Sequence, residues 1–173
     1  MAVLKNADAT LGNLETSIFD SRSFTGSPQA EFGGAYHVSL PAVGPDLKKM
    51  GFNIVSFANN YAFDWGVEGM RETCRLLDQS EIVYAGAGES LAQAAAARFL
   101  ETLRGRVGLV SCATMFTPQS RAAEPAAKPP GRPGVNALRL TRQVIVSRVM
   151  LEDLKCSAAI METGRRRLWW PVG

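Results

Sequence analysis

The clearest hydrophobic pattern in the sequence is the apolar run FNIVSFA at residues 52–58. A continuous run of this length predicts a β-strand with both faces covered, as in a parallel sheet. Just before it, Pro45 and Asp46 predict the start of a short helix, and Gly51 predicts its end. The run IVYAGAG at residues 82–88 predicts a second short strand that breaks at its glycines.

Between these two runs the spacing of apolar residues changes to that of a helix. Val67, Met70, Cys74 and Leu77 follow one another at intervals of three, four and three, which place them on one helical face. Glu68 falls in the first turn, where the helix dipole favours a negative charge. We therefore expect an amphipathic helix whose apolar stripe belongs to the core.

The rest of the chain predicts shorter elements and loops. A turn near Arg104 and Gly105 predicts an antiparallel hairpin within residues 97–113. The other predicted elements are a strand within residues 7–15, a short helix at 90–97, a last helix over 141–154, and loops at 21–41 and 118–133. Strands that alternate with helices indicate the α/β class, with a mostly parallel sheet and one antiparallel hairpin.

Composition and charge limit the possible partners. Of the 173 residues, 46% are hydrophobic and 20% are charged, which is the balance of a folded domain. The net charge is +3, and the basic residues are not gathered into one stripe, so we expect no nucleic-acid partner. We expect an α/β domain at residues 1–140, followed at 141–173 by a helix and a basic-aromatic tail. The RRRLWW stretch of that tail is interpreted either as a surface-binding patch or as a segment unrelated to the domain.

The sequence carries no membrane or export signal that we recognise. No run reaches the ~18 apolar residues of a membrane span. The first ten residues, MAVLKNADAT, lack the apolar segment of a signal peptide. We therefore expect the chain as written to remain in the cytoplasm.

The three cysteines, Cys74, Cys112 and Cys156, lie far apart and form no CxxC pair. Cys74 and Cys112 have apolar neighbours. We therefore expect both to be buried free thiols rather than disulfide partners or zinc ligands.

Polar residues follow two predicted strands and suggest a site. GNLE places Asn13 and Glu15 after the first strand, and ANN places Asn59 and Asn60 after the second. Ligands of parallel sheets bind outside the carboxyl ends of the strands, so we expect both segments to converge on one cleft. In the alternative interpretation these residues have only local roles. Asn60 forms a turn, Glu15 is a solvated carboxylate, and Asp64 caps a helix rather than orienting the site.

Several blocks together resemble the poly-γ-glutamate capsule-biosynthesis (CapA) family. They are ADATLGNLET, LKKMGFNIVSFANNYAFDWGVEGMRETCRLLDQSEIVYAGAGESLAQA and RGRVGLVSCAT, over about residues 5–140. This family belongs to the calcineurin-like metallophosphoesterase superfamily. The resemblance implies a partial metallophosphoesterase-like layered α/β fold and a hydrolase with a two-metal site, in which metals polarise a phosphoryl oxygen and activate water.

The resemblance also implies roles for particular residues. Asn13, Glu15 and Asn60 correspond to metal positions, with Mn or Mg as the expected ions, and Tyr61 and Asp64 become the candidate catalytic residues. Tyr61 stands where the superfamily has a histidine, and a phenol does not shuttle protons near neutral pH as an imidazole does. The family's Gly-Asp block precedes residue 1 and its histidine blocks follow the proline-rich loop, so we expect a fragment that binds metal only weakly.

Two other sequence features do not change this picture. The single histidine, His37, has no other ligand type at a useful spacing, so we do not expect it to bind metal. Gly86 and Gly88 lack the third glycine of a dinucleotide fingerprint, because position 91 is Leu91.

Two hypotheses follow from the sequence. The first is a CapA-like metal-dependent hydrolase that acts on a small-molecule or polyglutamate-type substrate. The second is a catalytically silent, truncated α/β binding module. Peptide-modifying chemistry on the same scaffold also stays open, because a fold does not fix a function.

Overall fold

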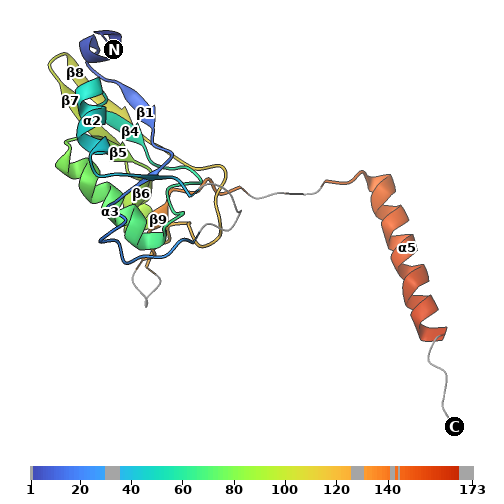
Figure 1. Cartoon of the computed structure of the whole chain (residues 1–173). Helices are drawn as coiled ribbons and strands as arrows, with labels where there is room; N and C mark the ends of the chain where they lie inside the picture. The colour runs from blue at the N-terminus through green and yellow to red at the C-terminus, as the bar shows by residue number, and fades with distance from the viewer. Residues whose placement is uncertain (1, 30–35, 126–130, 141–142, 144, 168–173) are drawn as a thin grey trace. The chain divides into compact units, whose positions relative to one another are not determined.

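A computed structural model gives the structure of the chain and describes residues 2–29, 36–125, 131–140, 143 and 145–167 (Figure 1). Contacts divide the chain into two units, Met1–Leu138 and Arg139–Gly173. The helices of the first unit are α1 (Ala2–Asn6), α2 (Val43–Met50), α3 (Gly66–Gln79) and α4 (Leu91–Ala95). Its strands are β1 (Leu11–Asn13), β2 (Ser17–Ile18), β3 (Val38–Ser39), β4 (Ile54–Ser56), β5 (Val83–Ala85), β6 (Ala87–Gly88), β7 (Arg98–Thr102), β8 (Gly105–Leu109) and β9 (Gly134–Val135). The second unit contains α5 (Arg148–Arg167).

The main sheet confirms the predicted α/β class. Its strand order is β1-β4-β5, and both pairings are parallel. The central strand β4 comes from the FNIVSFA run, and Ile54 and Val55 are both buried. An apolar run is suited to this position because a central parallel strand is covered on both faces.

The other pairings are shorter. Strands β7 and β8 form the predicted antiparallel hairpin, whose last pair is Thr102 with Gly105. Strands β6 and β9 are also antiparallel, whereas β2 and β3 are parallel. Strand β3 lies inside residues 21–41, so the prediction of an uninterrupted loop there was wrong. A two-residue strand is too short to show a periodic pattern.

The two longer helices of the first unit follow the predicted pattern and lie beside the sheet (Figure 1). Helix α2 ends at Gly51, which has φ +110° and donates its N–H to the carbonyl of Lys48. This left-handed conformation is the usual reason for glycine at a helix end. Helix α3 buries Met70 and Leu77 and has Glu68 in its first turn, as expected.

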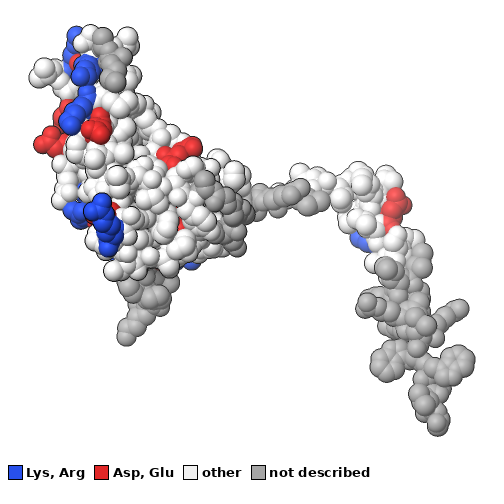
Figure 2. Space-filling view, viewed as in Figure 1, with Lys and Arg blue, Asp and Glu red and all other residues white. Residues whose placement is uncertain are grey.

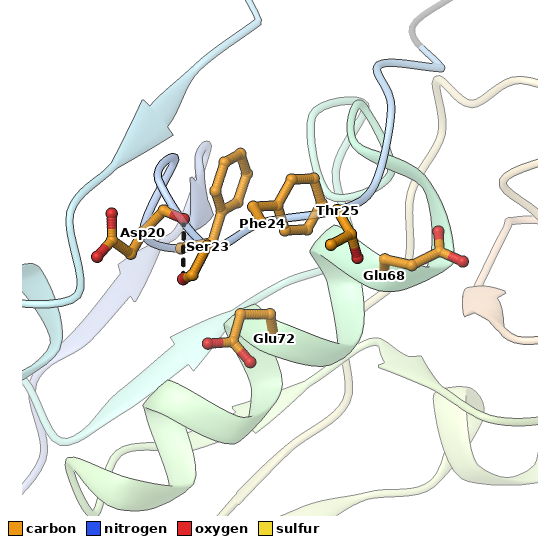
Figure 3. Close-up of a pocket in the computed structure, with 7 residues that line it drawn as sticks. Asp20, Ser23, Phe24, Thr25, Glu68 and Glu72 are labelled. Carbon is orange, nitrogen blue, oxygen red and sulfur yellow. Dashed lines mark hydrogen bonds between the residues drawn. The ribbon is translucent and has the colours of Figure 1, made fainter.

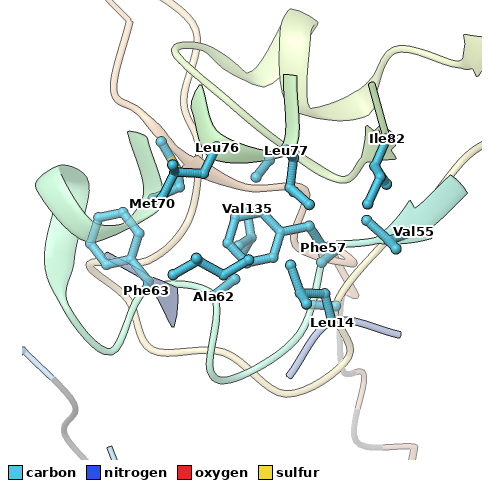
Figure 4. Close-up of a cluster of buried hydrophobic side chains, with 14 residues drawn as sticks. Leu14, Val55, Phe57, Ala62, Phe63, Met70, Leu76, Leu77, Ile82 and Val135 are labelled. Atoms are coloured by element: carbon cyan, nitrogen blue, oxygen red, sulfur yellow. The ribbon is translucent and has the colours of Figure 1, made fainter. Parts of the chain in front are cut away.

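The core forms where α3 packs against the strands and the loop after β4 (Figure 4). Phe57 is fully buried, with Leu14, Met70 and Leu77 in the same cluster. Val135 from β9 joins them, so the chain after the proline-rich loop closes over residues from the first half. The residues around the end of β4 are therefore fixed on their buried side.

Helix α5 begins later than predicted. We expected a helix over residues 141–154, but residues 143 and 145–147 are not helical and the helix starts at Arg148. Residues 141, 142 and 144 and the tail at 168–173 lie outside the described part. Ser147 caps the helix, because its Oγ accepts a hydrogen bond from the N–H of Met150 at 3.2 Å.

Charges on the first unit are mixed. Figure 2 shows Lys and Arg side chains in separate groups with Asp and Glu beside them. Ion pairs account for part of this mixing: Arg71–Glu89, Arg75–Glu72, Arg104–Asp8 and Arg106–Glu101.

Within the described residues, no helix combines the length and the apolar character that crossing a bilayer requires.

Candidate functional site

The carboxyl ends of β1 and β4 lie side by side. Asn13, the last residue of β1, pairs with Ser56, the last residue of β4. The N–H of Leu14 continues this pairing and donates to the carbonyl of Ser56 at 2.9 Å. The chain segments that leave the two strands therefore begin at the same edge of the sheet.

The side chain of Asn59 joins these two segments. Its Nδ2 donates to Oδ1 of Asn13 at 3.1 Å and to the carbonyl of Leu14 at 2.8 Å. Its Oδ1 accepts a hydrogen bond from the N–H of Tyr61 at 3.1 Å, which holds the turn after β4. The predicted convergence of GNLE and ANN is confirmed, and Asn59 is the residue that makes it.

A cleft of about 250 Å³ opens at this edge. One wall consists of Asn13, Ala58, Asn59 and Asn60, and the other is the segment 112–115. The cleft is thus lined by the end of β1, the turn after β4 and a segment that follows β8 along the chain.

Hydrogen bonds through Ser111 fix the second wall. The hydroxyls of Ser111 and Ser56 are 2.6 Å apart, which ties the wall to the end of β4. The carbonyl of Ser111 accepts from Nδ2 of Asn136 at 2.8 Å. The N–H of Ala113 donates to the carbonyl of the same Asn136 at 2.8 Å. Both walls are thus held by the strands before any ligand arrives.

The three predicted metal residues lie in or next to the cleft. Asn13 and Asn60 line it, and Nδ2 of Asn13 donates to Oε1 of Glu15 at 2.7 Å. They offer two amide oxygens and one carboxylate, which are hard ligands suited to a weakly held ion such as Mg²⁺. Among the described residues, no group of three His, Cys, Asp or Glu side chains could hold a metal ion. This donor set does not fit a tightly bound pair of transition metals.

The two predicted catalytic residues, Tyr61 and Asp64, are not among the residues that line the cleft. The ring of Tyr61 meets the ring of His37 edge to face, with centroids 4.8 Å apart. Asp64 is buried at 8% exposure. Burial raises the pKa of its carboxyl group to about 6, and the charge of His37 partly opposes this rise.

Asp64 does not cap helix α3, which was the alternative interpretation of this residue. Trp65, not Asp64, occupies the N-cap position of α3, and no side chain caps the helix there. The backbone carbonyl of Asp64 accepts a hydrogen bond from the N–H of Gln29 at 2.6 Å. Asp64 is therefore a buried carboxyl group beside the exposed His37, whose ring also contacts the half-buried Tyr61.

Sequence reasoning missed two contributions to this region. His37 was set aside because no ligand type lies near it in sequence, yet the fold brings it to Tyr61. The wall at 112–115 also went unrecognised, although its position at the carboxyl end of a predicted strand could have indicated it.

The cysteine predictions need a correction. Cys112 is exposed in the cleft wall, so the prediction that it is buried was wrong. Ser111 and Ala113 on either side of it are buried, so the alternation of the extended chain leaves Cys112 on the exposed side. Cys74 on α3 is partly buried, and burial raises its pKa to about 12. The Cys74 thiol is therefore protonated and unreactive at neutral pH.

A second and larger cavity, of about 320 Å³, lies elsewhere on the first unit (Figure 3). Asp20, Glu68 and Glu72 line it together with Phe19 and Phe24. Glu72 is already paired with Arg75 at 2.6 Å. None of the predicted site residues lies in this acidic cavity.

Comparison with known proteins places the chain in a family. Residues 1–162 match the family described as bacterial capsule synthesis protein PGA_cap, and the chain belongs to this family. The predicted resemblance is confirmed, and the match extends beyond about residue 140, where we expected it to end.

The similar proteins are longer than this chain. Proteins y4sH and y4uA of Sinorhizobium fredii (strain NBRC 101917 / NGR234), both named as uncharacterized, are each 68% identical over 153 residues. These residues are 88% of this chain and 33% of each relative, so the chain spans about a third of their length.

Two Bacillus proteins with a named role are similar over shorter stretches. The capsule biosynthesis protein CapA of Bacillus anthracis is 29% identical over 89 residues, which are 50% of this chain and 21% of that protein. The PGA biosynthesis protein CapA of Bacillus subtilis (strain 168) is 42% identical over 48 residues, which are 28% of this chain and 13% of that protein.

Proposed function

We propose that this chain supplies the substrate cleft of a CapA-like capsule-biosynthesis protein that acts as a metal-dependent hydrolase. Its substrate in this proposal is a polyglutamate-type polymer or a small molecule related to one. The observation that carries the proposal is the convergence of Asn13, Asn59 and Asn60 on one cleft at the carboxyl ends of β1 and β4. This is the edge of a parallel sheet at which ligands bind.

The proposed metal is a single, weakly held Mn²⁺ or Mg²⁺. Asn13, Glu15 and Asn60 would hold it through oxygen atoms, because these donors fit a hard ion. When bound, such an ion activates water as a nucleophile and polarises the bond to be broken. Asn59 has a positioning role, since its hydrogen bond keeps the side chain of Asn13 at the cleft.

The proposed roles of Tyr61 and Asp64 differ. Tyr61 follows Asn60 directly and can donate a hydrogen bond to a leaving group at the edge of the cleft. Asp64 acts as a positioning residue in this proposal: its charge interacts with that of His37, whose ring contacts Tyr61. General acid help from a well-placed side chain typically contributes a factor of about 10² to 10⁴ to a rate.

A binding module without catalysis is the second candidate. It is favoured by the hydrogen bonds that already engage both Asn13 and Asn59 within the chain. Such a module would present the same cleft to a ligand without a metal ion.

Calorimetric titration with Mn²⁺, together with turnover of p-nitrophenyl phosphate esters in added Mn²⁺, separates the two candidates. The hydrolase predicts binding at millimolar or lower concentration and a rate above buffer, both of which are lost in Asn60→Ala. The matched control is Asn6→Ala, an exposed asparagine of α1 at the opposite end of β1. Absence of Mn²⁺ binding and of turnover in the parent chain would contradict the hydrolase and leave the binding module.

A further inference from the structure

The cleft at the ends of β1 and β4 is lined by uncharged groups. Its polar side chains are the amides of Asn13, Asn59 and Asn60, the thiol of Cys112 and the hydroxyl of Thr114. No Lys, Arg or His is among its lining residues in the described part of the chain. Proteins usually recognise phosphate and carboxylate groups with Arg, Lys or helix N-termini.

Among the described residues, the charged side chain that is hydrogen-bonded to the lining has the wrong sign for an anion. Glu15 accepts a hydrogen bond from Asn13 at 2.7 Å, so its carboxylate lies next to the cleft. In the cleft without a metal ion, an anionic group would therefore meet repulsion rather than a counter-charge. The chemistry of the lining instead suits a neutral, polar ligand.

Two lining side chains have hydrogen-bonding capacity to offer. Asn59 is engaged with Asn13, Leu14 and Tyr61. The side chains of Asn60 and Thr114, by contrast, make no hydrogen bond to any residue that the structure describes. An asparagine amide offers both a donor and an acceptor, and a threonine hydroxyl can serve as either.

We propose that this cleft binds a neutral secondary amide, the link between units of a glutamyl-type polymer, and does not recognise the carboxylates of that polymer or a phosphate group. On opposite walls, Nδ2 of Asn60 donates to the C=O of the amide and the hydroxyl of Thr114 accepts from its N–H, which leaves Oδ1 of Asn60 for a metal ion. Met115, which is 61% exposed, contacts the methylene groups beside it. The proposal rests on the proposed function and specifies which part of the substrate the cleft reads.

The rigidity of the walls makes this recognition effective. The wall with Thr114 is fixed through the hydroxyl pair of Ser56 and Ser111 and through Asn136. The wall with Asn60 is fixed by Asn59. A cleft that is already formed loses little conformational entropy when it binds a ligand.

The test measures binding to the full chain by calorimetry in EDTA, so that no metal ion contributes. The probes are a γ-linked glutamyl tripeptide, its analogue with ester links in place of the amide N–H groups, and inorganic phosphate. We expect the ester to bind about 3- to 10-fold more weakly than the amide, which is the usual effect of one neutral hydrogen bond. We expect no competition by phosphate and little change in affinity between low and high salt.

Variants assign the effect to the cleft. Asn60→Ala and Thr114→Val are each expected to weaken tripeptide binding about 3- to 10-fold. At least one of the two variants should weaken binding of the ester analogue by a smaller factor than it weakens binding of the tripeptide. Asn6→Ala is the matched control and is expected to bind the tripeptide as the parent does. Thr114 is exposed, so its replacement by valine keeps the test available if Asn60→Ala does not fold. Equal binding of ester and amide, or tighter binding of phosphate than of tripeptide, would overturn the proposal.

These results are distinguishable from a failure of the proposed function. Amide-selective binding without Mn²⁺-dependent turnover would support the inference and contradict the hydrolase. Turnover of a phosphate ester by a chain that does not distinguish amide from ester would support the hydrolase and contradict the inference.

Discussion

Asp64 gives a direct prediction of how stability depends on pH. This aspartate is 8% exposed, and burial raises the pKa of its carboxyl group from 3.8 to about 6. The interaction with His37 lowers the pKa but is the smaller effect. The perturbation that tests this interpretation is Asp64→Asn, which keeps the size of the side chain and removes its charge.

The sign follows from proton binding in the two states. Between pH 4 and 6 the folded chain holds more protons at this carboxyl than the unfolded chain, because its pKa is higher when folded. The free energy of unfolding therefore falls as the pH rises through this range. The pKa rises from 3.8 to about 6, and each pKa unit corresponds to about 1.4 kcal/mol. Ionised Asp64 therefore lowers the free energy of unfolding at pH 7 by at most ~3 kcal/mol. Access of water to the carboxyl group reduces this value.

Urea denaturation at several pH values between 4 and 7.5 measures the effect. We expect Asp64→Asn to be more stable than the parent at pH 7, by about 1 to 2 kcal/mol, with the difference disappearing toward pH 4. Asp46→Asn, at an aspartate with a 61% exposed side chain, shows what the loss of an exposed carboxylate does to the same curve. If the parent gains stability relative to Asp64→Asn as the pH rises, the ionised carboxylate is stabilising and our reasoning is wrong.

Two further predictions concern the cleft and the core. Asn59→Ala removes the hydrogen bonds to Asn13 and Leu14 and should lower the free energy of unfolding by about 1 to 3 kcal/mol. Urea denaturation measures this loss, with Asn6→Ala as the control. Equal stability of the two variants would show that Asn59 does not hold the cleft together. Leu77→Ala leaves a cavity at a fully buried position and should lower the free energy of unfolding by about 2 to 5 kcal/mol. Leu103 is fully exposed, so Leu103→Ala should lower it by less than about 0.5 kcal/mol. A small effect at Leu77 would mean that the core around α3 is loosely packed.

Much of the fold could be predicted because several signals are local. The apolar run at residues 52–58 indicated a central parallel strand, since only a strand covered on both faces is apolar throughout. Gly51 indicated a helix end, and its φ of +110° is the reason. The pairing of β6 with β9 could not be predicted, because it joins short segments separated by the proline-rich loop. Ser147 was a missed signal, since a serine cap at this position marks the true start of α5.

The candidate site could be predicted only in part. The rule that ligands bind at the carboxyl ends of parallel strands correctly brought Asn13 and Asn59 together. The same sequence reasoning could not bring His37 to Tyr61, because that contact depends on how a loop returns to the sheet. It also misjudged Cys112, whose exposure follows from the chain leaving the hairpin to form a cleft wall.

Carboxylate side chains could attract a divalent ion to the acidic cavity as well as to the cleft, although no three of the described His, Cys, Asp and Glu side chains are grouped to hold a metal ion. The acidic cavity lined by Asp20, Glu68 and Glu72 has more carboxylates than the cleft, but it lies away from the joined strand ends. The cleft has one adjacent carboxylate and the amides that the proposed hydrolase requires. Competition between these two places bears directly on the proposed function.

Paramagnetic broadening of NMR signals by Mn²⁺ decides between them, because the ion broadens the signals of nuclei close to it. In the isotope-labelled full chain, we predict that the side-chain amide signals of Asn13 and Asn60 broaden at the lowest Mn²⁺ concentrations, while that of Asn6 does not. Broadening that begins at Glu68 and Glu72 and leaves the amides of the cleft unchanged would contradict a metal-dependent site at the ends of β1 and β4.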